Sequence, residues 1–99
     1  MISIESKTEL IFLGQRLRKL RIERRDRQTD FAARLGVSIP TLRKMEQGDP
    51  SVAVGTWVDA FWLLDRLDDM KKVLTQSESL FSRWEQEHKT GTRQRVYKK

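Results

Sequence analysis

The chain lacks cysteine altogether and has a single histidine among its 99 residues. It therefore forms no disulfide and no thiolate metal site, and the lack of thiols is typical of a reducing compartment. No apolar run approaches the roughly 20 residues that a membrane helix requires, and we expect no secretory signal. We find no glycine-rich phosphate loop, nucleophile elbow or cluster with metal-ligand spacing. The sequence thus predicts a cytoplasmic protein that is not an enzyme and holds no metal or cofactor.

Positive charge, by contrast, is abundant: the chain has 20 Lys and Arg against 14 Asp and Glu, for a net charge of +6. Residues 1–48 carry 11 basic and 6 acidic side chains, residues 49–82 carry 3 and 6, and residues 83–99 carry 6 and 2. A basic segment of this kind is typical of a surface that binds nucleic-acid phosphates. The acidic middle segment is expected to face away from nucleic acid and to be available for protein contacts.

Residues 28–46 have the pattern of two short helices joined by a tight turn. Gly36 falls where the first helix must end in a left-handed conformation, which glycine adopts without a steric penalty. Ser38 can cap the next helix by accepting a bond from a free backbone N–H, and Ala32 is small where the two helices cross. This arrangement is the helix-turn-helix, whose second helix enters the DNA major groove. The apolar side chains expected to hold both helices to one core are Leu35, Val37, Leu42 and Met45.

Three further helices are predicted around this unit. Leucines at three- and four-residue steps indicate a first helix that opens at the capping-box residues Ser6–Glu9 and reaches about Arg24. A short edge strand or loose arm is expected before it, at Met1–Glu5. A fourth helix is expected over Val54–Leu64, and its predicted core face consists of Val54, Trp57, Val58, Phe61 and Leu64. The apolar stripe of a short fifth helix consists of Leu67, Met70, Val73 and Leu74.

The predicted fold is therefore all-α, with a five-helix domain over residues 1–74. A short helix and a basic tail follow over residues 75–99. Beyond Glu85 the tail is polar and nearly without apolar side chains, so it cannot bury enough surface to offset its ordering entropy alone. We expect this tail to be partly disordered or to bind a partner.

The outward face of the helix after the tight turn is the candidate for reading DNA bases. Pro40 sits in the first turn of this helix, where a missing N–H is no loss. Ile39, Pro40 and the Thr41 methyl suit thymine methyl groups, while Arg43 and Lys44 suit either guanine edges or phosphates. The full set of candidates for DNA binding is Arg25, Arg27, Gln28, Thr29, Ser38, Ile39, Pro40, Thr41, Arg43, Lys44 and Gln47.

Bulky apolar side chains remain after the core has been assigned. Trp62 lies at the edge of the core face of the fourth predicted helix and Leu63 roughly opposite that face, which favours a buried interface. A symmetric homodimer built on the end of this helix and on the fifth would set two recognition helices about one DNA turn apart, as a palindromic operator requires. The candidates for a dimer or partner interface are Trp62, Leu63, Leu67, Met70, Phe81 and Trp84.

The run over residues 13–74 resembles the phage-repressor-like helix-turn-helix domain of the Cro and repressor class. The residues that carry the resemblance are Gln28, Ala32, Gly36, Val37, Ser38, Leu42 and Glu46. It implies sequence-specific binding to double-stranded operator DNA at the nucleoid, and an ion pair between Arg21 and Glu46 that orients both groups. The chain departs from the pattern at Asp26 and at Arg27, where Ser or Thr usually caps the second helix. We expect Asp26 to serve as the cap instead.

A narrower likeness follows in residues 48–56, which read Gly-Asp-Pro-Ser-Val-Ala-Val-Gly-Thr. Together with Trp62 and Leu67-Asp68-Asp69, this segment resembles HipB-like antitoxins. The resemblance implies a protein that represses its own operon and binds a HipA-like serine/threonine kinase toxin encoded beside it. Two alternatives stay open. One is a free-standing Cro-class regulator without a toxin, and the other is a protein-interaction module that has lost sequence reading.

Overall fold

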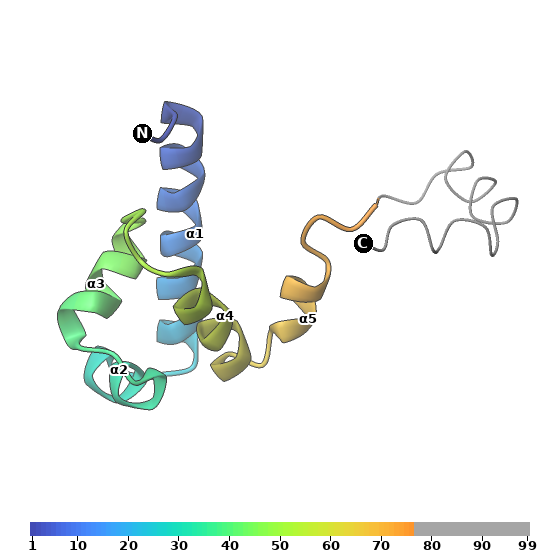
Figure 1. Ribbon diagram of the computed structural model, residues 1–99. Helices are drawn as coiled ribbons and strands as arrows, with labels where there is room; N and C mark the ends of the chain where they lie inside the picture. The colour runs from blue at the N-terminus through green and yellow to red at the C-terminus, as the bar shows by residue number, and fades with distance from the viewer. Residues whose placement is uncertain (77–99) are drawn as a thin grey trace, which may run out of the picture.

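The computed structural model describes residues 1–76, so Phe81 and Trp84 of the predicted interface lie outside the described residues. Within residues 1–76 the chain forms five α-helices and no strand (Figure 1), and the all-α prediction is confirmed. The helices are α1 (Ile4–Glu23), α2 (Gln28–Leu35), α3 (Ile39–Gln47), α4 (Val54–Leu63) and α5 (Leu67–Lys71). The division into two parts at residue 74 stays a prediction.

Helix α1 begins earlier than the sequence pattern indicated. Its cap is Ser3, whose Oγ accepts a hydrogen bond from the Ser6 N–H at 3.0 Å. The edge strand expected over Met1–Glu5 is therefore wrong, the loose arm is limited to residues 1–3, and the capping box at Ser6–Glu9 does not open the helix. Both serines can cap a helix, but capping at Ser3 adds backbone bonds at the start of α1, such as the one from the Lys7 N–H to the Ser3 carbonyl at 3.0 Å.

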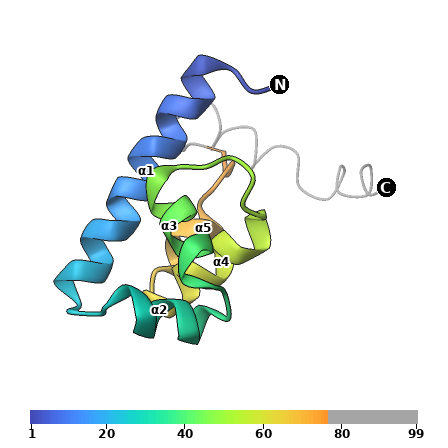
Figure 2. The same ribbon diagram turned by 90° about the vertical axis from the view of Figure 1, so that its left-hand side faces the viewer.

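The core lies where α1, α2, α3 and α4 meet. Figure 2 shows α1 running along one side of α3 and α4, with α2 across one end of the group. The buried apolar residues are Leu17, Phe31, Ala32, Leu42, Met45, Trp57, Ala60 and Leu64. Leu35 and Val37 are half-buried and pack against this core. The apolar side chains predicted to hold the helix-turn-helix therefore all lie in or against one core.

The buried face of α4 differs from the predicted one. Ala60 is fully buried, whereas Val54, the first residue of the helix, is 70% exposed. Steps of three and four residues join Trp57, Ala60 and Leu64 into the buried line, and Val54 lies about 90° from the centre of that line around the helix axis. The predicted core position of Val54 is therefore wrong. Val58 and Phe61, the other two residues of the predicted core face, are half-buried.

The two bulky residues at the end of α4 have different surroundings. Trp62 is 65% exposed, as its position at the edge of the core face predicted. Leu63 is half-buried and packs against the core, so the outward placement predicted for it is wrong. The reason is that Leu63 lies only about 60° from Ala60 around the helix, and the core centres on Ala60 rather than on the predicted face.

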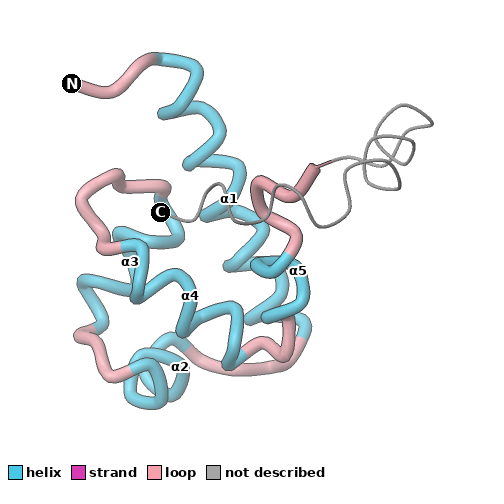
Figure 3. Tube along the Cα trace, turned by 45° about the vertical axis from the view of Figure 1, so that its right-hand side comes forward, coloured by secondary structure: helices cyan, strands magenta, loops and turns pink. Residues whose placement is uncertain are grey.

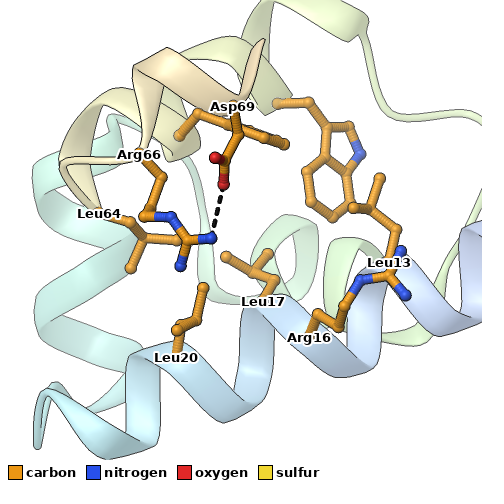
Figure 4. A pocket seen from close by; sticks show the side chains of 9 residues that line it. Leu13, Arg16, Leu17, Leu20, Leu64, Arg66 and Asp69 are labelled. Atoms are coloured by element: carbon orange, nitrogen blue, oxygen red, sulfur yellow. Dashed lines mark ion pairs between the residues drawn. The ribbon is translucent and has the colours of Figure 1, made fainter. Parts of the chain in front are cut away.

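Helix α5 is shorter than predicted and ends at Lys71, so Val73 and Leu74 lie beyond it. No residue of α5 is buried. Between α1, α4 and α5 lies a cavity of about 140 Å³ with mostly apolar walls, and Arg66 and Asp69 at its edge form an ion pair of 2.7 Å (Figure 4). The core therefore holds α5 less firmly than the other helices.

The loop between α3 and α4 begins at Gly48, which ends α3 with a φ of 81°. The Asp49 carboxylate then accepts hydrogen bonds from the Ser51 N–H at 2.8 Å and from the Ser51 hydroxyl at 2.7 Å. Both donors stabilise the ionised carboxylate, the hydroxyl most, and they hold the pKa of Asp49 below its usual value. The segment therefore forms a tight turn that is fixed by its own side chains.

Candidate nucleic-acid interface

The turn between α2 and α3 has the geometry that its residues predict. Gly36 ends α2 in the left-handed conformation, with a φ of 79°, and its N–H donates back to the last turn of the helix. Ser38 caps α3, because its Oγ accepts a bond from the Thr41 N–H at 3.2 Å. Pro40 lies in the first turn of α3, where its missing N–H breaks no bond. Local chemistry thus determines where α2 ends and α3 begins.

The start of α2 has no side-chain cap. Arg27 occupies the cap position and makes no capping hydrogen bond, so the expectation that Asp26 caps this helix is wrong. The Asp26 carboxylate instead pairs with Arg34 and, at 3.7 Å, with Arg24. Two guanidinium groups are stronger partners for a carboxylate than backbone N–H groups are. The first N–H groups of α2 are therefore left for an external acceptor, and the positive end of a helix favours an anion there.

A buried ion pair joins the end of α1 to α3. The Nε of Arg21 donates to Oε2 of Glu46 at 2.6 Å, and its Nη2 donates to Oε1 at 3.1 Å. Both residues are buried, with exposed fractions of 6% and 7%. The Nη1 of Arg21 donates to the Asp26 carbonyl at 2.7 Å. This is the pair that the resemblance implied, and it also fixes the connection between α1 and α2.

A chain of polar contacts leads from this pair to the surface. The Nε2 of Gln28 donates to Oε1 of Glu46 at 3.1 Å, and the Nε of Arg43 donates to Oε1 of Gln28 at 3.5 Å. The first residue of α2 is thereby held between the buried carboxylate and an exposed arginine of α3. The sequence analysis did not find this contact, although Gln28, Arg43 and Glu46 were each candidates. The contact could not be predicted because the three residues are separated along the chain, and only the packing of α2 on α3 brings them together.

Most of the predicted DNA-binding side chains lie at the surface. Ile39 is the main departure, since it is half-buried and packs against the core, which only partly fits its predicted outward placement. Ile39 is the first residue of α3. Gln28 and Thr41 are half-buried as well. The exposed candidates are Arg25, Arg27, Thr29, Ser38, Pro40, Arg43, Lys44 and Gln47.

Helix α5, which carries Leu67 and Met70 of the predicted dimer or partner interface, lies apart from α3. Figures 1 and 3 show α3 and α5 on opposite sides of α4. Trp62 at the end of α4 is exposed, and Leu67 and Met70 of α5 are half-buried. These side chains lie on α4 and α5, whereas the exposed candidates for base reading lie on α3.

Two further findings concern other kinds of site. Within residues 1–76, no three or more of the His, Asp and Glu side chains are grouped so that they could hold a metal ion. None of the described helices combines the length and the apolar character needed to cross a membrane. Neither finding places a ligand or an enclosed site near α3.

Comparison with known proteins gives one match. A sequence model described as a helix-turn-helix domain matches residues 13–70, which include α2, the tight turn and α3. No curated protein and no solved structure matches the chain. The match covers more than half of the 99 residues and leaves out the first turns of α1.

Proposed function

Because the chain belongs to the helix-turn-helix domain family, we propose that it is a transcriptional repressor that reads an operator sequence with α3. The family itself indicates a DNA-binding regulator. The observation that carries the proposal is the exposed face of Pro40, Arg43 and Lys44 on α3, beside the uncapped start of α2. A DNA phosphate at the start of α2 would accept hydrogen bonds from the free N–H groups of that helix, while α3 lies in the major groove. The proposal assigns the chain no catalytic activity.

Separate Arg43→Ala and Lys44→Ala variants test whether these side chains read bases. Removing a base-reading side chain should weaken operator binding by about 1–3 kcal/mol and relax the preference at one position. The measurement is competition against duplexes that each differ from the operator at one base pair, at fixed salt. Lys72→Ala, which removes a cation beyond α5, is the control and should change neither quantity. A variant that weakens binding to all duplexes alike would assign that residue to phosphate binding.

We further propose that two copies form a homodimer through the end of α4 and through α5. The exposed Trp62 and the partly exposed Leu67 and Met70 support this interface, since aromatic side chains are common anchors of interfaces. Trp62→Glu is expected to give a folded monomer by light scattering, with a native circular-dichroism spectrum. Operator affinity should fall by about a hundredfold or more, because the two half-sites are then bound independently. A Trp62→Glu protein that stays dimeric in dilute solution, as tightly as the unmodified chain, would contradict this interface.

The finer proposal is that this repressor is the antitoxin of a HipA-like kinase toxin and represses the operon that encodes both. Its support is the resemblance in residues 48–56 and the exposed Trp62 at the end of α4. The proposed contacts with the toxin are made by Trp62, Phe81 and Trp84. Leu63, which was predicted to join them, packs against the core and is left out of this set.

A pull-down from the native host with the full chain as bait tests the antitoxin proposal. We expect a kinase-like protein to be recovered in stoichiometric amount, and Trp62→Ala to reduce its recovery while the fold is kept. Recovery of the chain with itself and with operator DNA alone would contradict the antitoxin role. The protein would then be a free-standing regulator of the Cro class.

A further inference from the structure

Helix α1 carries an exposed apolar stripe, and at one edge of it Ile11 lines a pocket with residues 47–50. The exposed fractions are 74% for Ile4, 43% for Ile11, 46% for Phe12 and 47% for Ile22. The first three of these residues precede residue 13, where the family match begins. The first turns of α1 extend beyond the other helices (Figures 1 and 2). The helix-turn-helix domain therefore does not account for this surface.

The stripe runs along the length of α1. At 3.6 residues a turn, Ile4, Ile11 and Ile22 lie within about 20° of one another around the helix axis, and Phe12 lies about 80° from Ile4. The buried Leu17 lies about 140° from Ile4, on the side of the core. From Ile4 to Ile22 the stripe spans about 27 Å. An exposed apolar face of this length indicates a contact with another protein surface.

Charged residues along one edge of the stripe are unevenly distributed by sign. On the Phe12 side, Glu5 and Glu9 lie in the first half of α1 and Arg16 and Lys19 in the second half, where Glu23 at the end of the helix is the exception. Within residues 1–76, none of these charged residues forms an ion pair. An antiparallel copy of the same helix would bring the acidic half against the basic half, whereas a parallel copy would bring like charges together.

We propose that α1 pairs antiparallel with α1 of a second copy, about a two-fold axis that passes near Leu13. Ile4 then lies opposite Ile22 of the second copy, and the acidic edge of each helix lies against the basic edge of the other. On the opposite edge of the stripe, Lys7 lies near Arg18 of the second copy. Glu5 likewise lies near Glu23 of the second copy, so the arrangement has two kinds of unfavourable contact, and the Lys7–Arg18 contact provides a sharp test.

The pairing is separate from the proposed dimer through α4 and α5, so it joins dimers to one another. Two helices that meet over about 27 Å form an interface at the small end of the usual range, and the pairing is expected to be weak in dilute solution. Dimers bound to neighbouring operators have a high local concentration, so α1 pairing would make their binding cooperative. This cooperative effect rests on the proposed function, whereas the pairing itself does not.

The test is sedimentation analysis of the full chain at a series of concentrations, in a Trp62→Glu background that removes the α4–α5 dimer. Trp62→Glu is expected to be monomeric in dilute solution and to associate weakly at the high end of the concentration series, and Ile4→Glu should weaken that association about fivefold or more. Lys19→Glu and Arg18→Glu make the same charge change at adjacent exposed positions. Lys19→Glu should weaken association about fivefold or more, and Arg18→Glu should strengthen it by a similar factor. Each effect is counted twice because the pair is symmetric.

Three outcomes would overturn the pairing: no association in the Trp62→Glu background, an unchanged association after Ile4→Glu, or the same effect from both charge reversals. Circular dichroism of each variant shows that the fold is kept, which is expected because these positions are exposed. Failure here is distinct from failure of the proposed function. Operator binding by the unmodified chain is measured separately, and its absence would leave the result for α1 unaffected.

Discussion

Replacing Glu46 with alanine is expected to lower the free energy of unfolding by about 3–5 kcal/mol. The substitution leaves the buried guanidinium of Arg21 without its carboxylate, and two of its hydrogen bonds are lost at once. Gln28 also loses its acceptor. Urea unfolding followed by circular dichroism measures the effect. Glu23→Ala, at an exposed position of α1, is the matched control and should change stability by less than about 0.5 kcal/mol.

A double substitution separates the loss of the pair from the loss of one partner. Arg21→Met combined with Glu46→Leu replaces both charges by apolar groups and should recover most of the stability, because no unpaired buried charge remains. The double variant still lacks the acceptor that holds Gln28, so its operator affinity is expected to stay below that of the unmodified chain. A Glu46→Ala variant that loses less than about 1 kcal/mol would contradict the structural role of the pair.

Gly14→Ala is the second substitution with a large expected effect. A Cβ at this position would lie 2.5 Å from the Met45 carbonyl oxygen and 2.6 Å from the Glu46 carbonyl oxygen. Both neighbours are backbone atoms of α3, so the substitution forces α1 and α3 apart. We expect a loss of about 3 kcal/mol or more in the free energy of unfolding, measured by urea unfolding, since overpacking against backbone cannot relax through side chains.

Gly55→Ala is the matched control for this prediction. Gly55 also lies in a helix, but a Cβ there would meet nothing within 4 Å. Alanine is the better helix former, so this variant is expected to be as stable as the unmodified chain or more stable by up to about 1 kcal/mol. Equal effects of Gly14→Ala and Gly55→Ala would show that α1 and α3 do not approach as closely as the structure has them.

The parts of the fold that depend on neighbours in the sequence were predictable. The left-handed Gly36 and the Ser38 cap follow from backbone sterics and from a short reach between side chain and backbone. Gly14 and Gly48 have a different kind of role, because α1 approaches α3 and the start of the following loop at these two residues. No periodic pattern marks such an approach. The sequence analysis therefore did not identify the closest contact between two helices.

The incorrect predictions share a physical cause, which is competition between local and distant partners. Asp26 has the chemistry of a cap, but the guanidinium of Arg34 attracts its carboxylate. In α4, the helical period correctly indicated an amphipathic helix, yet the small Ala60 rather than Val54 lies at the centre of the buried face. The size of a side chain and the position of a helix end determine which residues become buried. Both act through packing between helices, which cannot be read from the sequence.

The sequence allowed the residues of the candidate interface to be predicted, but not the contacts among them. Exposed basic positions on α3 follow from the helical period. The connection from Glu46 through Gln28 to Arg43 does not, because it depends on how α2 and α3 pack. This connection links the buried pair to an exposed arginine of α3.

Selection of the unmodified chain's binding sites from a pool of random duplexes tests the central claim most directly. The selected duplex and a scrambled duplex of the same composition are then compared by affinity at the same salt concentration. We expect a palindromic site that binds about a thousandfold more tightly than the scrambled duplex. Equal affinities, falling alike with salt, would show that the chain binds phosphates without reading sequence and would contradict the repressor.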